Sequence, residues 1–230
     1  MRTRIKTDTT AREHAHEVRL GDTFDFLNTD DTEHGHAHER LPTLDSALDW
    51  FVSRGVIHLE GADRVRSQAA ADPLYAAHDL SRIHRVRSAL RETTQAIVEH
   101  RTPNQASLRI VNRALHARQV IELVPSLDGS VAVDHRHVGD PVDDALARLA
   151  DPLVTELVAG HPERIKICAS DRCDWIFYDD SRTSRRRWCD MSTCGNRAKA
   201  RRHRERTRSA QVQPSPLVDV LGIPAITLVR

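Results

Sequence analysis

The chain has 230 residues, of which 39% are hydrophobic, 29% are charged and only 4% are aromatic. This composition supplies an aliphatic core of Leu, Val, Ile and Ala, and it excludes collagen-like, disulfide-rich and wholly disordered proteins. No apolar run approaches the roughly 20 residues that span a bilayer, and the first ten residues lack the apolar segment of a secretory signal. We therefore expect a cytoplasmic protein with reduced thiols and no membrane partner.

The formal net charge of +1 conceals an uneven distribution along the chain. Residues 1–160 contain 19 basic and 25 acidic residues, whereas residues 161–210 contain 14 basic and 7 acidic ones. A mildly acidic body followed by a basic module is typical of a protein whose module binds a polyanion. The alternative is an arginine-rich surface that is simply solvated.

The first part of the chain predicts a mainly helical domain over residues 20–160, after a disordered N-terminus at 1–19. Two β-prone stretches, 119–125 and 130–137, flank the turn signal Leu127-Asp128-Gly129 and predict a small hairpin. Apolar residues at helical spacing predict helices over 43–54, 63–70, 73–100, from Pro103 onward and over 141–160.

The segment before the first of these helices is harder to assign. Residues 20–29 fit either a strand or one or two helical turns, and a polar stretch over 30–40 follows. This stretch carries alternating histidines, His34, His36 and His38, which would share one face of a strand and suit a transition metal. Because the chain contains 14 histidines, we expect a solvated loop here instead.

All four cysteines lie within 27 positions, as two C-x4-C pairs: Cys168 with Cys173, and Cys189 with Cys194. Four thiolates in two pairs, with no cysteine left over, are typical of a closed tetrahedral zinc site. The alternative of two disulfides is disfavoured in a reducing compartment. We predict one structural Zn²⁺ with no open position for a catalytic water.

The residues around the cysteines predict a C-terminal, treble-clef-like zinc module with four cysteine ligands. A knuckle is followed by a hairpin that joins the β-prone run 175–178 to residues 185–188. A helix then starts near Cys194, with Ser192 or Thr193 as its cap. The first turn of this helix brings backbone N–H groups toward the negatively charged sulfurs.

The module is too short to bury much apolar surface. Trp175, Phe177 and Trp188 are its candidate core residues. The metal must therefore supply much of its folding free energy. We expect a chelator to unfold residues 165–205 and to leave the helical domain folded.

Residues 195–208 predict a helix that is strongly basic and has almost no apolar face. Across 182–208 there are 11 basic and 2 acidic residues. Like charges four residues apart repel each other, so a polyanion would stabilise this helix, and arginine offers paired donors to phosphate or guanine. We expect binding to double-stranded DNA, with RNA as an alternative. The candidate contact residues are Arg185, Arg186, Arg187, Asn196, Arg197, Lys199, Arg201, Arg202 and Arg204.

The run from Cys194-Gly195-Asn196-Arg197 to Arg204, preceded by Arg187-Trp188-Cys189 and by Cys168…Cys173, resembles the CGNR-type zinc finger. This resemblance assigns residues 161–208 to the finger and the four cysteines to zinc. It marks Asn196 and Arg197 as signature positions that either contact DNA or brace the zinc turn. Residues 209–230 extend beyond the finger.

The upstream region resembles the ABATE domain, which accompanies this finger in bacterial transcription regulators. The residues that carry the resemblance are Phe24–Thr29, the helix that contains Trp50, and the helix that contains Arg87, Leu90 and Arg91. Together the two resemblances cover about residues 20–208. They imply a stress-linked transcription regulator whose finger holds zinc and binds DNA.

Other functions fit the sequence less well. The sequence contains no Gly-rich phosphate loop and no G-x-S-x-G motif. Treble-clef nucleases use an Asp-His pair around a metal, but the Asp134-His135 pair of this chain lies outside the zinc module. We therefore do not expect an enzyme. A small-molecule sensor is an alternative, with Asn28, Arg87 and Arg91 as the candidate ligand pocket. In that case the zinc module would be only a structural staple. DNA-binding regulators are often dimers, which makes a homodimer the prior expectation.

Overall fold

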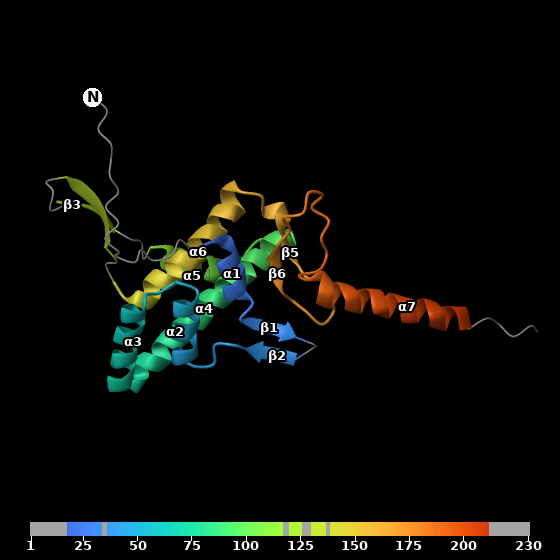
Figure 1. The fold of residues 1–230 in the computed structure, drawn as a ribbon, viewed down its shortest axis with the longest axis horizontal. Coiled ribbons are helices and arrows are strands. Elements are labelled where there is room, and N and C mark those ends of the chain that lie inside the picture. The colour runs from blue at the N-terminus through green and yellow to red at the C-terminus, as the bar shows by residue number, and fades with distance from the viewer. Residues whose placement is uncertain (1–17, 34–35, 117–119, 126–129, 137–138, 212–230) are drawn as a thin grey trace, which may run out of the picture. The chain divides into compact units, whose positions relative to one another are not determined.

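The computed structural model describes residues 18–33, 36–116, 120–125, 130–136 and 139–211. These residues are mainly α-helical, with three small antiparallel hairpins (Figure 1), so the predicted fold class is confirmed. The chain divides into two compact units, residues 1–189 and 190–230. The elements of the first unit are α1 (Leu20–Leu27), β1 (Asp30–Glu33), β2 (His36–Glu39), α2 (Leu44–Ser53), α3 (Leu59–Ala71), α4 (Pro73–Val98), α5 (Gln105–Leu115), β3 (Val120–Pro125), β4 (Val131–Arg136), α6 (Pro141–Ala159), the 3-10 helix η1 (Pro162–Arg164), β5 (Ile165–Ile167) and β6 (Ile176–Tyr178).

The long helices begin where a side chain caps them. Thr43 accepts a hydrogen bond from the N–H of Ser46 at the start of α2, and Asp140 accepts one from the N–H of Val142 at the start of α6. Such caps satisfy N–H groups that have no partner inside the helix. These local signals explain why the predicted helices over 43–54, 73–100 and 141–160 are confirmed within a few residues.

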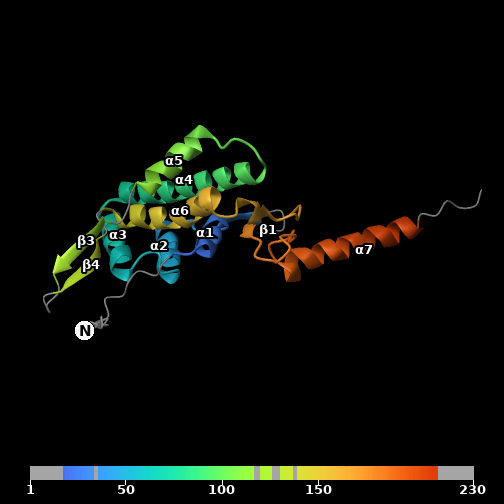
Figure 2. The same cartoon turned by 90° about the horizontal axis from the view of Figure 1, so that it is seen from above.

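The core of the first unit is built around α4. This helix contacts α1, α2, α3, α5 and α6, and Figure 2 shows α5 and α6 running beside it. Ile83, Val86 and Leu90 recur at helical spacing on α4, and all three are buried in the core with Phe26 and Phe51. Burial of this apolar stripe is the main force that holds the helices together. Within the described residues, no helix combines the length and the apolar character that a membrane span requires.

The predicted loop over 30–40 is wrong for its described residues, because 30–33 and 36–39 form the β1–β2 hairpin. Asp31 pairs with His38 in the antiparallel register, and the N–H of Arg40 donates to the carbonyl of Thr29 to close the base. His36 and His38 lie two residues apart on β2 and are exposed, whereas His34 lies outside the described residues. The two strands pair through their backbone groups. Their side chains are mostly polar, so the sequence shows no alternation of apolar and polar residues that would predict a strand.

The first half of the cysteine-containing segment belongs to the same core as the helices. β5 pairs with β6 in antiparallel register, and Ile165 and Ile176 are buried in the core that α1 and α4 share. The predicted pairing of 175–178 with 185–188 is therefore wrong. Of the predicted core residues of the module, Phe177 is buried but is not part of the helical core. Strand partners are selected by tertiary packing, which local composition does not reveal.

Truncation of Ile165 should therefore destabilise the helical domain, although the residue lies beyond its last helix. We expect Ile165→Ala to lower the free energy of unfolding by about 2–5 kcal/mol, the usual result of truncating a buried aliphatic side chain. Urea denaturation of the full chain, followed by circular dichroism of the helices, measures this change.

The matched control is Val158→Ala, because the Val158 side chain is 82% exposed and should change stability by no more than about 0.5 kcal/mol. If Ile165→Ala behaves like this control, the hairpin is not part of the core.

Candidate metal centre and basic helix

Strand pairing brings the first two cysteines together. Cys168 follows β5 directly and Cys173 precedes β6, so the antiparallel hairpin places both at the same end. The N–H of Cys168 donates to the carbonyl of Trp175 at 2.9 Å, and the N–H of Ala169 donates to the carbonyl of Arg187 at 2.8 Å. The second of these bonds ties the knuckle to the segment that leads into Cys189.

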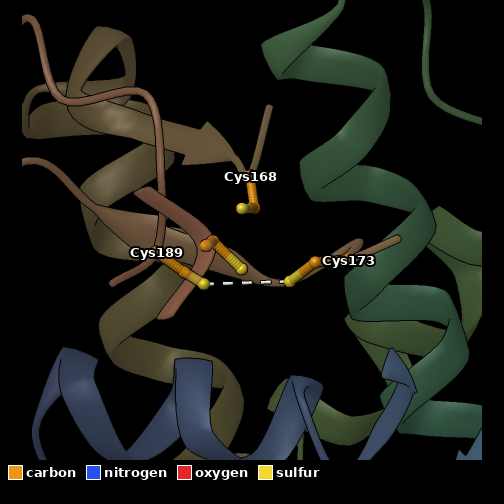
Figure 3. A group of neighbouring side chains, drawn as sticks. Cys168, Cys173 and Cys189 are labelled. Atoms are coloured by element: carbon orange, nitrogen blue, oxygen red, sulfur yellow. Dashed lines mark hydrogen bonds between the residues drawn. The ribbon is translucent and has the colours of Figure 1, made fainter. Parts of the chain in front are cut away.

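The four sulfur atoms form one compact group. All four Sγ atoms lie within 4.8 Å of one another, and Figure 3 shows those of Cys168, Cys173 and Cys189 gathered around a common point. Cys173 Sγ and Cys189 Sγ are 3.7 Å apart. Two thiolates on a tetrahedral Zn²⁺ at about 2.3 Å lie about 3.8 Å apart, whereas a disulfide requires about 2.05 Å. The donor set therefore fits zinc, and the four cysteines, all within the described residues, form no disulfide.

The surroundings of Cys168 favour its metal-binding form. Hydrogen bonding with the Cys189 side chain is the largest influence, and backbone hydrogen bonds from Cys189 and Ser170 act in the same direction. Together they outweigh burial and lower the pKa of Cys168 to about 5. The pKa of Cys168 is thus shifted toward the thiolate, which is the form that ligates metal.

Asp179 organises the loop that leads to Cys189, and the sequence analysis missed it. Its side chain is fully buried and accepts hydrogen bonds from Lys166 Nζ at 2.5 Å, from the Ser181 N–H at 3.0 Å and from the Arg186 N–H at 2.7 Å. Burial raises the pKa of Asp179, but these bonds lower it by more, so the pKa lies well below its usual range. The only signal in the sequence was the turn-like Asp179-Asp180-Ser181 run.

The three adjacent arginines of this loop differ in their surroundings. The Arg186 guanidinium donates to the carbonyls of Trp188 and Cys189 and lies 5.0 Å from the centre of the Phe177 ring. It therefore braces the backbone of a cysteine. Arg185 and Arg187, on either side, are exposed.

The second unit begins with a short π-helical turn, η2 (Met191–Gly195), and continues as α7 (Asn196–Gln211). Asp190 is the cap, because its carboxylate accepts from the Thr193 N–H at 2.7 Å and from Ser192 Oγ at 2.6 Å. Ser192 and Thr193, the two predicted caps, instead donate hydrogen bonds to Asp190. The Asn196 amide donates to the carbonyl of Ser192 at 3.0 Å, so this signature residue braces the turn.

Helix α7 carries seven basic residues and one acidic residue over its 16 positions. Arg201 Nε lies 3.8 Å from Glu205 Oε1, which is the i,i+4 pair expected on a helix surface. The predicted contact residues on this helix are all exposed: Asn196, Arg197, Lys199, Arg201, Arg202 and Arg204.

The three candidate pocket residues all have protein partners. The Asn28 side chain is 5% exposed, and its amide donates to the carbonyl of Ile176 at 2.8 Å while its oxygen accepts from the Ile176 N–H at 2.9 Å. Arg87 donates to Glu39 and, at 2.8 Å, to Thr29 Oγ1. Asn28 thus lies against β6, whereas Arg87 joins α4 to the β1–β2 hairpin.

Arg91, the third pocket candidate, also contacts the segment that leads into β6. Its guanidinium donates to the carbonyl of Leu27 at 3.1 Å and to that of Asp174 at 2.6 Å. Arg91 and Asn28 therefore converge on neighbouring residues of the cysteine-containing segment.

Two families match this chain. Residues 164–207 match the family described as "CGNR zinc finger", and residues 23–161 match ABATE, described as "Putative stress-induced transcription regulator". No curated protein matches the chain. The second match spans more than half of the 230 residues, and the four-sulfur group lies within the first. The chain therefore belongs to the ABATE family and carries a CGNR zinc finger after its ABATE domain.

Proposed function

We propose that the protein is a DNA-binding transcription regulator in which one structural Zn²⁺ is held by Cys168, Cys173, Cys189 and Cys194. The observation that carries this proposal is the four-sulfur group, followed immediately by an exposed, strongly basic helix. Four sulfur ligands complete a tetrahedron and leave no position for a substrate or a water, so zinc here supplies folding energy rather than catalysis.

The basic helix suits a polyanion better than it suits a protein core. Its basic residues far outnumber its single acidic residue, Glu205, and its side chains are exposed over 199–209. Sixteen residues of helix measure about 24 Å, and the major groove of duplex DNA admits a helix. Neutralisation of phosphates by these side chains releases counterions, which provides the driving force for binding.

The loop before Cys189 adds a second group of cations. Arg185 and Arg187 are exposed there, whereas Arg186 holds the carbonyls of Trp188 and Cys189. We assign phosphate contact to Arg185 and Arg187 and a structural role to Arg186.

The purified chain should contain about one zinc ion, measured by elemental analysis under reducing conditions. Cys173→Ser should leave it with much less than stoichiometric zinc, because one of four ligands is lost. Val158→Ala serves as the control that retains the metal. A wild-type chain with oxidised cysteines and no metal would contradict the proposed site.

DNA affinity should fall steeply as salt rises. Lys199→Ala combined with Arg202→Ala should reduce the slope of log K against log salt by about 2, one unit for each lost phosphate contact. Alanine maintains helix propensity at both positions, so the change reports charge.

The control for this double variant is Arg101→Ala combined with Arg109→Ala, which removes two positive charges from exposed positions of the helical domain. Fluorescence anisotropy with a labelled random duplex, a single strand and a structured RNA measures all three affinities. An unchanged slope in the α7 variant, or tighter binding of RNA than of duplex DNA, would contradict the proposal.

Neighbouring arginines should separate DNA contact from metal retention. Arg185→Ala should weaken DNA binding and leave zinc affinity unchanged, whereas Arg186→Ala should lower zinc affinity by about tenfold, as loss of a residue that orients a metal-binding segment usually does. Competition with a chromophoric chelator measures zinc affinity. If the two variants lose zinc equally, the distinction between them is wrong.

A further inference from the structure

Three consecutive residues that follow the ligand Cys173 are each held by a different residue of the helical domain. Asn28, at the end of α1, holds both backbone groups of Ile176, at 2.8 and 2.9 Å. Arg91, on α4, donates to the carbonyl of Asp174 at 2.6 Å and lies 2.9 Å from its carboxylate. Every residue in this arrangement lies within the first compact unit.

Trp175, between these two, provides the third contact. Its indole Nε1 donates to Asp31 Oδ2 at 2.6 Å, and Asp31 is 2% exposed. Its own carbonyl accepts the N–H of Cys168 at 2.9 Å. Trp175 therefore connects the buried carboxylate of β1, through its side chain, to the backbone of Cys168, through its carbonyl.

These contacts fix the position of residues 174–176 relative to the helical domain and also stabilise the fold. β6 pairs with β5 along one edge, and the Asn28 amide binds a donor and an acceptor of Ile176, as an additional strand would. The bonds between Asn28 and Ile176 are buried, where a hydrogen bond is stronger and its loss leaves a costly unsatisfied group. The knuckle 168–173 is thus fixed on both sides: Cys168 binds the carbonyl of Trp175, and Arg91 holds Asp174, the residue that follows Cys173.

We infer that Asn28, Asp31 and Arg91 are positioning residues for the metal centre, through which the helical domain sets the zinc affinity of the finger. This inference rests on zinc occupancy, as the proposed function does, and adds regulation of that same site. Any ligand or condition that displaces α1 from α4 changes the geometry of the first cysteine pair. Linkage is reciprocal, so zinc binding stabilises the helical domain by the same coupling free energy.

Asn28→Ala in the full chain tests the inference. The matched control is Thr23→Val, which removes a buried bond of the same kind from the same helix: Thr23 Oγ1 donates to the carbonyl of Leu149 at 2.9 Å, and neither residue belongs to the finger. Competition with a chromophoric chelator should show a zinc affinity about tenfold lower for Asn28→Ala and within about twofold of wild type for Thr23→Val.

Trp175→Phe provides a milder variant in case Asn28→Ala fails to fold. It retains an aromatic ring and removes the donor to Asp31, and we expect a loss of zinc affinity of about fivefold, the equivalent of one hydrogen bond. The absorption spectrum of bound Co²⁺ reports whether four sulfurs still surround the metal. Zinc affinities of Asn28→Ala and Trp175→Phe equal to that of Thr23→Val would overturn the inference.

Thermal unfolding of the helices completes the test. Zinc should raise the melting temperature of the wild-type helical domain, and should raise that of Trp175→Phe by less. A wild-type chain without zinc contradicts the proposed function itself. A zinc-loaded wild type that binds DNA, with zinc affinity unchanged in the variants, overturns only the coupling.

Discussion

Four cysteine sulfurs lie within 4.8 Å of one another. The rest of the finger must compensate for the mutual repulsion that this crowding causes when the cysteines are thiolates. Thiolates at such distances repel one another unless a cation lies between them. A Zn²⁺ ion bound there would still leave two negative charges, which polar groups around the loops would have to offset. The Arg186 guanidinium, which donates to the Cys189 carbonyl, adds a positive charge beside this cysteine, whereas the Asp190 carboxylate caps the turn that contains Cys194.

The boundary between the two families and the boundary between the compact units do not coincide. The family matches divide the chain between residues 161 and 164, whereas the compact units divide between 189 and 190. The difference arises because β5 and β6 contribute Ile165 and Ile176 to the helical core. A domain recognised by its motif is thus, in its first half, a physical part of its neighbour.

The elements that depend on neighbouring residues were predictable from sequence. The caps at Thr43 and Asp140 and the spacing of Ile83, Val86 and Leu90 are local signals, and so is the cysteine pattern. The features that the sequence did not predict depend on contacts between residues that are far apart in the chain. The strand partner of 176–178, the binding of Asn28 to a residue 148 positions away and the burial of Asp179 rather than the neighbouring Asp180 are all selected by tertiary packing. The β1–β2 hairpin was not predicted for another reason: its side chains are mostly polar and show no hydrophobic alternation.

X-ray absorption at the zinc edge of the purified full-length protein tests the central claim most directly. The account predicts a single shell of four sulfurs at about 2.3 Å, without nitrogen or oxygen neighbours. A shell that contains nitrogen or oxygen, or a protein whose sulfurs are oxidised and whose zinc is absent, would contradict it.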